Sequence, residues 1–256
     1  MKIAIIGYGK MGKMIEQTAR AGGHEIAAVV DPFAGDVHPG IPLSRSIEEA
    51  DLSFADAAIE FTRPDTAIAN IAALAQRKIP VVTGTTGWYE RMDEVRRAVE
   101  SADSSLLWAS NFSIGVNVFY RIAWYAAQLI NQFPEYDVGG FEAHHNKKID
   151  SPSGTAKTLA EGALSRIDRK KKIVWETLDR KIEEDELHFP SLRMGSVPGT
   201  HSLFFDSSAD TIEVTHTARS REGFASGAVR AARWLAAEKR RGLFTIDEML
   251  KDILKI

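Results

Sequence analysis

Short apolar runs alternate with amphipathic stretches through the first half of the chain. The runs with strand character are Lys2–Ile6, Glu25–Val30, Ala57–Phe61, Ile79–Thr83 and Leu106–Ala109. The stretches with helical spacing are Met11–Arg20, a segment from about Pro64, and Glu90–Ser101. Strands that alternate with helices in this way are typical of an α/β domain built on a doubly wound parallel sheet.

Two of these helices carry terminal signals. Gly22 and Gly23 follow the first helix and are expected to end it, because glycine readily adopts the left-handed conformation found at helix C-termini. Thr62 is the expected N-cap of the helix that begins near Pro64, since proline is favoured in a first helical turn.

The pattern changes after Asn111. The expected elements of the next part are a long helix over Ile114–Gln132, a strand over Val138–His144, a helix beginning near Ser153, and strands over His201–Phe205 and Thr211–Ala218. This mixture favours a second, α+β domain for substrate binding or assembly. The helices expected over Phe224–Lys239 and Ile246–Leu254 would then return to the first domain, because chain termini often lie close together.

A strongly charged stretch lies inside the second part, over Arg166–Glu186. It runs from Arg169-Lys170-Lys171-Lys172 to Glu183-Glu184-Asp185-Glu186. Opposite charges in succession are typical of a solvated helix or loop rather than of a binding patch.

Composition excludes several classes of function. The 256 residues are 44% hydrophobic and 26% charged, as in ordinary globular proteins, and the net charge is −3. That charge does not favour nucleic acid or an anionic membrane as a partner. Cysteine is absent, so disulfides and thiolate metal sites are excluded, and we expect no metal ion. No stretch approaches the ~18 apolar residues of a membrane span, and the apolar N-terminal run is too short for a signal peptide, so we expect a cytoplasmic protein.

The first candidate site is a glycine-rich turn between the first strand and the first helix. Its sequence is Gly7-Tyr8-Gly9-Lys10-Met11-Gly12, a G-x-G-x-x-G pattern. Glycines there permit a tight turn and close approach to a pyrophosphate, which the helix N-terminus attracts. In this strand–turn–helix context the pattern predicts a Rossmann-type dinucleotide site.

Asp31 ends the next strand, where an acidic side chain accepts hydrogen bonds from the adenosine ribose. A carboxylate there repels a 2′-phosphate, and Pro32 and Phe33 supply no compensating cation. We therefore expect NADH to be used at least as well as NADPH. Lys10 and Lys13 leave NADP open, since either could reach a 2′-phosphate, and Asp31 alternatively serves as a turn residue before Pro32.

Further strand ends carry small or hydroxylated residues. The candidate cofactor contacts there are Gly84, Thr85 and Thr86 after one strand, and Ser110, Asn111 and Phe112 after another. Ligands of open parallel sheets lie outside the carboxyl ends of the strands, so these loops fit against the nicotinamide and its ribose. The alternative is that each loop is a plain turn.

The second candidate site is a cluster of proton donors. His144, His145, Lys147 and Lys148 lie within five positions, and a turn that opens a helix follows them. Such a stretch suits a small substrate that bears carboxylates and must also receive a proton. A solvated, histidine-rich surface loop is the alternative.

With these motifs the chain resembles the 4-hydroxy-tetrahydrodipicolinate reductase (dihydrodipicolinate reductase) family, essentially from end to end. The resemblance rests on Glu142-Ala143-His144-His145, Lys148-Ile149-Asp150, Pro152-Ser153-Gly154-Thr155, Phe61-Thr62-Arg63-Pro64, Gly84-Thr85-Thr86-Gly87, Asn111-Phe112-Ser113-Ile114-Gly115-Val116-Asn117 and Phe224-Ala225-Ser226-Gly227-Ala228. Glu60 stands where the family commonly has aspartate.

The resemblance implies a dinucleotide-binding domain over residues 1–111, completed by helices in 222–256, and a substrate-binding and oligomerisation domain over 112–221. It implies reduction of a cyclic dicarboxylate by NADH or NADPH in diaminopimelate and lysine biosynthesis, by a homotetramer. His144 and Lys148 match the family's proton donors. His145 matches a substrate ligand, and Gly154 and Thr155 match the residues whose amides hold a substrate carboxylate.

Two other classes remain open from the sequence. A related amino-acid dehydrogenase, such as one acting on diaminopimelate, would share the nucleotide domain but gives no reason for the His-His-Lys run. A dinucleotide-sensing regulator would need a DNA-binding or partner module, which the −3 charge does not favour.

Overall fold

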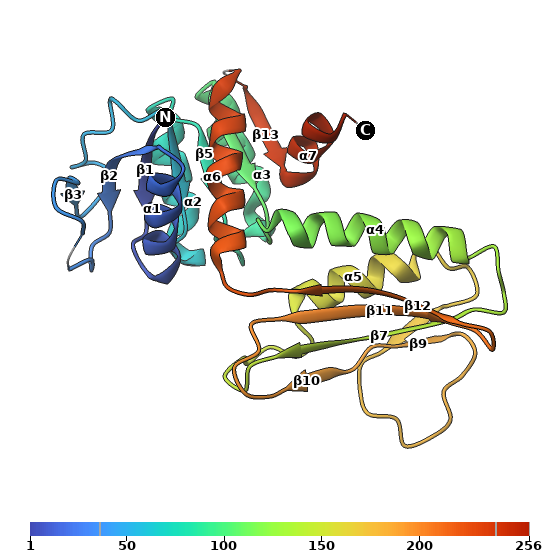
Figure 1. The fold of residues 1–256 in the computed structure, drawn as a ribbon. Coiled ribbons are helices and arrows are strands. Elements are labelled where there is room, and N and C mark those ends of the chain that lie inside the picture. The colour runs from blue at the N-terminus through green and yellow to red at the C-terminus, as the bar shows by residue number, and fades with distance from the viewer. Residues whose placement is uncertain (36, 239, 256) are drawn as a thin grey trace. The chain divides into compact units, whose positions relative to one another are not determined.

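The computed structural model describes residues 1–35, 37–238 and 240–255. They form two compact units, coloured along the chain in Figure 1. The first unit comprises Met1–Ser113 and Arg221–Ile256, and the second comprises Ile114–Ser220. The chain thus leaves the first unit close to Asn111 and returns to it close to Arg221.

A parallel sheet forms the centre of the first unit. Within the described residues it has seven strands in the order β13-β6-β5-β4-β1-β2-β3. Their bounds are β1 Lys2–Ile6, β2 Glu25–Val30, β3 Leu43–Ser44, β4 Ala57–Glu60, β5 Val81–Thr83, β6 Ser105–Trp108 and β13 Gly242–Thr245. Four of the five residues of β1 are buried, as expected for a central strand covered on both faces. The predicted doubly wound parallel sheet is therefore confirmed.

Helices cover this sheet. They are α1 Lys10–Ala21, α2 Pro64–Gln76, the short 3-10 turn η1 Tyr89–Arg91, α3 Met92–Ser101, α6 Glu222–Ala237 and α7 Ile246–Leu254. α1 packs against α6, and α2 packs against α3 (Figure 1). α6 also contacts β4, β5 and β6, so this C-terminal helix belongs to the first unit. Lys239, where the sequence suggested that this helix ends, lies outside the described residues.

The second unit is a mixed sheet with two helices. Its strands run in the order β12-β11-β7-β9-β8, and β10 also pairs with β7. The bounds are α4 Ile114–Ile130, β7 Asp137–His144, α5 Gly154–Leu164, β8 Lys172–Val174, β9 Glu186–His188, β10 Ser191–Arg193, β11 Thr200–Asp206 and β12 Thr211–Thr217. Apolar side chains of α4 and α5 form one core with Leu187, Phe189 and Phe205. The predicted mixed α+β domain is confirmed.

The charged stretch Arg166–Glu186 is not simply solvated, contrary to the sequence prediction. Lys170 is 5% exposed and Glu186 1% exposed, and β8 lies between them. The ammonium of Lys170 donates to the carbonyls of Glu184 and Glu186 at 2.9 and 2.8 Å. Glu186 itself pairs with Arg180 at 2.6 Å. Burial is tolerated here because each charge has close partners, which a charge pattern alone does not reveal.

Thr62 is not the N-cap of α2, as the sequence suggested. Arg63 occupies that position, with no hydrogen bond from its side chain to the first turn. The hydroxyl of Thr62 instead donates to the carboxylate of Glu60 and accepts from the side-chain amide of Asn70.

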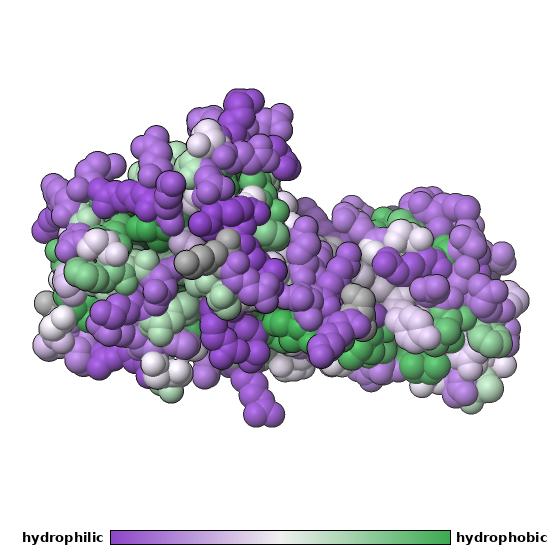
Figure 2. All heavy atoms as spheres, turned by 90° about the horizontal axis from the view of Figure 1, so that it is seen from above, coloured by the Kyte–Doolittle hydropathy of each residue, from purple (hydrophilic) through white to green (hydrophobic). Residues whose placement is uncertain are grey.

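Hydrophilic side chains cover much of the face seen in Figure 2, with hydrophobic patches between them. Among the described residues, none of the helices has the length and hydropathy needed to cross a bilayer.

Gly227 permits a close approach within the first unit. A side chain there would collide with the backbone carbonyl of Phe112, which cannot rotate away. We expect Gly227→Ala to lower the free energy of unfolding by ~2 kcal/mol, because overpacking outweighs the better helix propensity of alanine. The melting temperature should fall by roughly 4–8 °C in calorimetry. Ser226→Ala, at the adjacent exposed position of α6, is the control and should leave the melting temperature unchanged. Equal melting temperatures of the two variants would contradict this packing argument.

Candidate active site

The glycine turn has the geometry that a dinucleotide requires. Gly7 has φ of +90°, and a side chain there would collide with the carbonyl of Phe61. A side chain at Gly12 would collide with the carbonyl of Gly7. Space is open at Gly9, the N-cap of α1, which makes no side-chain hydrogen bond. The first amides of α1 therefore stay accessible to a pyrophosphate, and the residues present fit a dinucleotide.

Asp31 joins the end of β2 to the glycine turn. Its carboxylate accepts from the amide of Tyr8 at 2.6 Å and from the amide of Phe33 at 2.7 Å. Asp31 lines a cavity of about 430 Å³ together with Gly7 and Gly9. Acidic acceptor and glycine turn thus meet at one cavity, as the sequence predicted.

Arg45 lines the same cavity and was not among the site residues predicted from the sequence. β3 pairs in parallel with β2, with Ser44 beside Val30, so Arg45 follows next to the end of β2. Its guanidinium donates to the carbonyl of Pro32. A cation therefore lies close to Asp31 after all, and no pattern around a two-residue strand could have indicated it.

The side chain of Tyr8 serves the protein rather than this cavity. Its hydroxyl bonds with buried Glu16. Burial, and to a smaller extent this hydrogen bond, raises the pKa of Tyr8 to about 12. The ammonium of Lys13 lies 5.8 Å from the centre of the Tyr8 ring, and both residues line a separate cavity.

Other predicted cofactor residues line two further cavities of the first unit. Lys10, Met11, Gly84, Thr85 and Thr86 surround one of about 460 Å³. Ser110 and Phe112 line another of about 280 Å³ with Met11, Gly84 and Arg221. Phe61 contributes to both of these cavities and to the one beside Asp31. The three cavities therefore follow the carboxyl ends of the strands, where ligands of such sheets bind.

A buried carboxylate, that of Glu60, holds the loop ends of β4 and β5 together. Glu60 has no solvent exposure. It accepts hydrogen bonds from the hydroxyls of Thr83 and Thr85 and from the amide of Thr62. The side-chain oxygen of Asn111 accepts from the amide of Ser113 at 2.9 Å.

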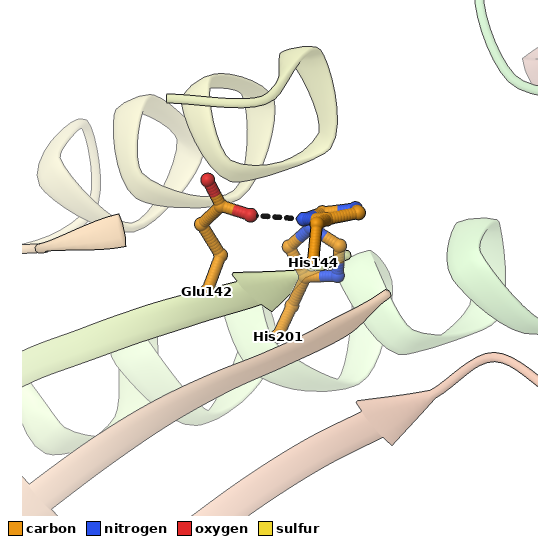
Figure 3. A group of neighbouring side chains, drawn as sticks. All are labelled: Glu142, His144 and His201. Atoms are coloured by element: carbon orange, nitrogen blue, oxygen red, sulfur yellow. Dashed lines mark hydrogen bonds and ion pairs between the residues drawn. The ribbon is translucent and has the colours of Figure 1, made fainter. Parts of the chain in front are cut away.

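The second unit gathers an acid and two imidazoles at the ends of adjacent strands. Figure 3 shows Glu142 and His144 on β7 and His201 on neighbouring β11. The Nδ1 atom of His144 bonds with a carboxylate oxygen of Glu142. The rings of His144 and His201 lie edge to face at 5.1 Å. The proposed proton donor is therefore a buried, oriented imidazole and not part of a solvated loop.

Two buried groups of this cluster have shifted pKa values. Burial alone would raise the pKa of Glu142, but hydrogen bonds from His144 and Arg193 outweigh it and lower the pKa to about 2. Burial, followed by the proximity of His144, lowers the pKa of His201 to about 3. At neutral pH Glu142 is a carboxylate and His201 is uncharged.

Glu142, His144 and His201 are close enough together to hold a metal ion. The oxygens of Glu142 already have partners, however. Arg193 donates to Oε1 at 2.8 Å, the amide of Ser153 donates to Oε1 at 3.3 Å, and His144 bonds to Oε2. A metal ion between Glu142 and His144 would have to displace the hydrogen bond to Nδ1 and lie close to the guanidinium on Oε1, so the cluster is better suited to holding a proton than a metal ion.

The remaining predicted residues lie in the loop after β7. Lys148 pairs with Asp150 at 2.7 Å, and Lys147 is exposed. The Nδ1 atom of His145 is buried and has no hydrogen-bond partner among the described residues. Such an orphaned donor or acceptor is suited to a ligand group.

α5 begins where the sequence predicted. Ser153 is its N-cap and accepts from the amide of Ala156 at 3.1 Å. Gly154 and Thr155 form the first turn, and the space beside Gly154 is open. First-turn amides have no carbonyl partner within a helix, so this end of α5 suits an anion such as a carboxylate.

Comparison with known proteins supports both halves of this description. The family model described as dihydrodipicolinate reductase, N-terminus, matches residues 1–112. The model described as dihydrodipicolinate reductase, C-terminus, matches residues 115–250. The fold is similar to that of a dipicolinate-bound dihydrodipicolinate reductase from Paenisporosarcina sp. TG-14, with a TM-score of 0.77 at 22% identity, covering 96% of this chain and 97% of that one.

Relatives match over the full length. The 4-hydroxy-tetrahydrodipicolinate reductase of Christiangramia forsetii is 40% identical, with all of both chains covered. That of Archaeoglobus fulgidus is 36% identical, covering 98% of this chain and all of the relative. Together with the two family models, this identity shows that the chain belongs to the 4-hydroxy-tetrahydrodipicolinate reductase family.

Proposed function

We propose that this protein reduces 4-hydroxy-tetrahydrodipicolinate to tetrahydrodipicolinate with NADH or NADPH, with loss of the 4-hydroxyl group as water, in the pathway to diaminopimelate and lysine. The observation that carries the proposal is the Glu142–His144 pair, which lies in the same unit as Lys148 and the start of α5. Proton donor, cation and anion site are the three features that a dicarboxylate needing a proton would use. Full-length similarity to the named reductases supports the same activity.

His144 is the proposed proton donor and acceptor. When bound, the reduced nicotinamide supplies a hydride to the substrate ring, and the charge that develops there must be met by a proton. An imidazole suits this task near neutral pH. Lys148, the proposed second donor, adds a positive charge that favours a dianionic substrate and stabilises the developing negative charge.

Substrate carboxylates are proposed to bind at His145 and at the start of α5. The buried Nδ1 atom of His145 offers one polar contact. The amides of Gly154 and Thr155 offer others, and the helix dipole favours a negative charge there. Open space beside Gly154 lets a ligand approach the backbone closely.

The cofactor contacts are proposed to be Gly7 to Gly12, Asp31, and the loops around Gly84 to Thr86 and Ser110 to Phe112. Asp31 would accept hydrogen bonds from the adenosine ribose, which supports use of NADH. Arg45 changes the expectation for NADPH, because its guanidinium could pair with a 2′-phosphate in the cavity that Asp31 also lines. We propose dual use, with NADH at least as effective.

We further propose a cytoplasmic homotetramer assembled through the second unit. Apolar side chains on that unit are exposed, among them Ile122, Leu129, Phe133, Leu192 and Ile212. Their contact with other copies would remove apolar surface from water. A reaction that consumes reduced nicotinamide nucleotide supports the cytoplasmic location.

The activity itself is tested by following NADH absorbance with freshly generated 4-hydroxy-tetrahydrodipicolinate. We expect oxidation of NADH only when this substrate is present. Nucleotide binding without turnover would instead indicate a sensor. Nucleotide reduction with diaminopimelate, and no reaction with the cyclic substrate, would indicate a dehydrogenase.

His144→Ala should lower kcat by ~10²–10⁴-fold, the usual contribution of general acid–base catalysis, because the proton donor is removed. NADH affinity, measured by fluorescence titration, should change little, since the glycine turn lies in the other unit. His188→Ala is the matched control, a histidine of the same unit whose ring nitrogen bonds to the carbonyl of Glu176. An unchanged kcat in His144→Ala would remove this residue from proton transfer.

Arg45→Ala should raise the KM for NADPH roughly tenfold, as expected for the loss of one charge-assisted contact of ~1.5 kcal/mol. The KM for NADH should stay within about twofold, because NADH has no 2′-phosphate. Arg91→Ala, which breaks only an exposed pair with Glu94 in the same unit, is the control. Equal changes for both nucleotides would argue against a phosphate contact, and a strong NADPH preference of the unaltered protein would overturn the preference proposed here.

A further inference from the structure

We infer that Glu142, held by Arg193 and the amide of Ser153, sets the tautomer of His144, so that only Nε2 of this imidazole exchanges protons with a ligand. Glu142 and Arg193 are then positioning residues that act through His144. The inference deepens the proposed function and rests on it for the role of His144.

The hydrogen bonds around Glu142 leave one arrangement. Its oxygen Oε1 faces two donors, Nη2 of Arg193 at 2.8 Å and the amide of Ser153 at 3.3 Å. Its oxygen Oε2 faces Nδ1 of His144. A carboxylate can only accept, so Nδ1 of His144 must carry a hydrogen. In the neutral ring Nε2 is then the acceptor. In the charged ring Nε2 carries the proton that can be given away.

The surroundings of His144 support the same orientation. His201, which faces the ring from β11, is 4% exposed and uncharged at neutral pH, so Glu142 is the nearest countercharge for an imidazolium. A Cβ added to Gly199 would lie 2.9 Å from Nε2. Glycine at this position therefore leaves room beside the nitrogen that exchanges the proton.

Arg193 also connects the pair to the loop of Lys148. The same Nη2 atom that binds Glu142 donates to the carbonyl of Asp150 at 2.7 Å. The carboxylate of Asp150 pairs with Lys148 at 2.7 Å. The guanidinium of Arg193 thus contacts the partner of each proposed proton donor, Glu142 beside His144 and Asp150 beside Lys148. It fixes the loop of Lys148 relative to β7.

Replacement of Glu142 by glutamine gives a sharp test. The glutamine oxygen must face Arg193 and the Ser153 amide, because both are donors. Its NH₂ group then points at Nδ1 of His144 and requires an acceptor there. The variant should hold His144 as the Nε2–H tautomer and disfavour the imidazolium, which carries hydrogens on both nitrogens.

The measurement is a nitrogen–proton correlation spectrum of the full protein, labelled with ¹⁵N-histidine. The chain has seven histidines, so the His144 signal is assigned by its loss in His144→Gln. We expect the Nδ1–H tautomer in the unaltered protein and the Nε2–H tautomer in Glu142→Gln. Arg193→Met should retain Nδ1–H, because Glu142 still presents only acceptors.

Kinetics provide the second readout. Glu142→Gln should lower kcat by ~100-fold or more while the KM for the cyclic substrate changes less than about threefold. Glu186→Gln is the matched control, since Glu186 is equally buried and paired with arginine but lies away from His144. Its kcat should stay within about twofold.

Two results would overturn the inference: an Nε2–H tautomer in the unaltered protein, or an unchanged tautomer and kcat in Glu142→Gln. The spectrum of the unaltered protein decides the question even if the variant fails to fold. The spectra need no substrate. If Glu142→Gln changes the tautomer as expected but the unaltered protein has no reductase activity, the positioning role stands and only the proposed function is overturned.

Discussion

A carboxylate without solvent contact must be matched by donors, and the second unit is arranged around one such group. Glu142 is fully buried, and its charge would cost several kcal/mol if unpaired. Its partners come from β7, from β10 and from the turn before α5, namely His144, Arg193 and Ser153. The need to satisfy one charge therefore brings together the segments that also carry the proposed catalytic histidine and the proposed carboxylate site.

The first unit follows the same rule at a different place. Glu60 is also fully buried and collects donors from Thr62, Thr83 and Thr85. Thr62 and Thr85 line a cavity whose other residues include proposed cofactor contacts, and Thr83 ends β5 next to the loop that carries Thr85. In both units a buried acid orders the loops at strand ends and so holds the side chains beside it in place.

Much of this fold could be predicted from the sequence, because its main signals are local. The apolar runs that became β1 and β2, and the glycine turn between β1 and α1, need only neighbours along the chain to be recognised. Short strands such as β3 and β13 carry no such period and are defined by the strand beside them. Thr62 illustrates the same limit, since its hydroxyl bonds to a buried carboxylate at the end of β4, which its local sequence does not indicate.

The candidate site divides in the same way. His144 and Lys148 stood out because they cluster in sequence, and Gly154 because it opens a helix. Arg45 and Arg193 did not, since each reaches its place through strand pairing, β3 beside β2 and β10 beside β7. An isolated arginine has no sequence signal for what it will face.

Arg193 shows why such a residue matters for the chemistry. It neutralises part of the charge of Glu142, and a neutralised partner is a weaker base that leaves the proton on His144 rather than taking it. At the same time its bond to the carbonyl of Asp150 ties down the loop that bears Lys148. The same guanidinium therefore sets both the proton affinity of Glu142 and the position of the loop that bears Lys148. Arginine suits this double role because its planar fork holds several acceptors in fixed directions, whereas a lysine ammonium would hold them as a rotating point charge.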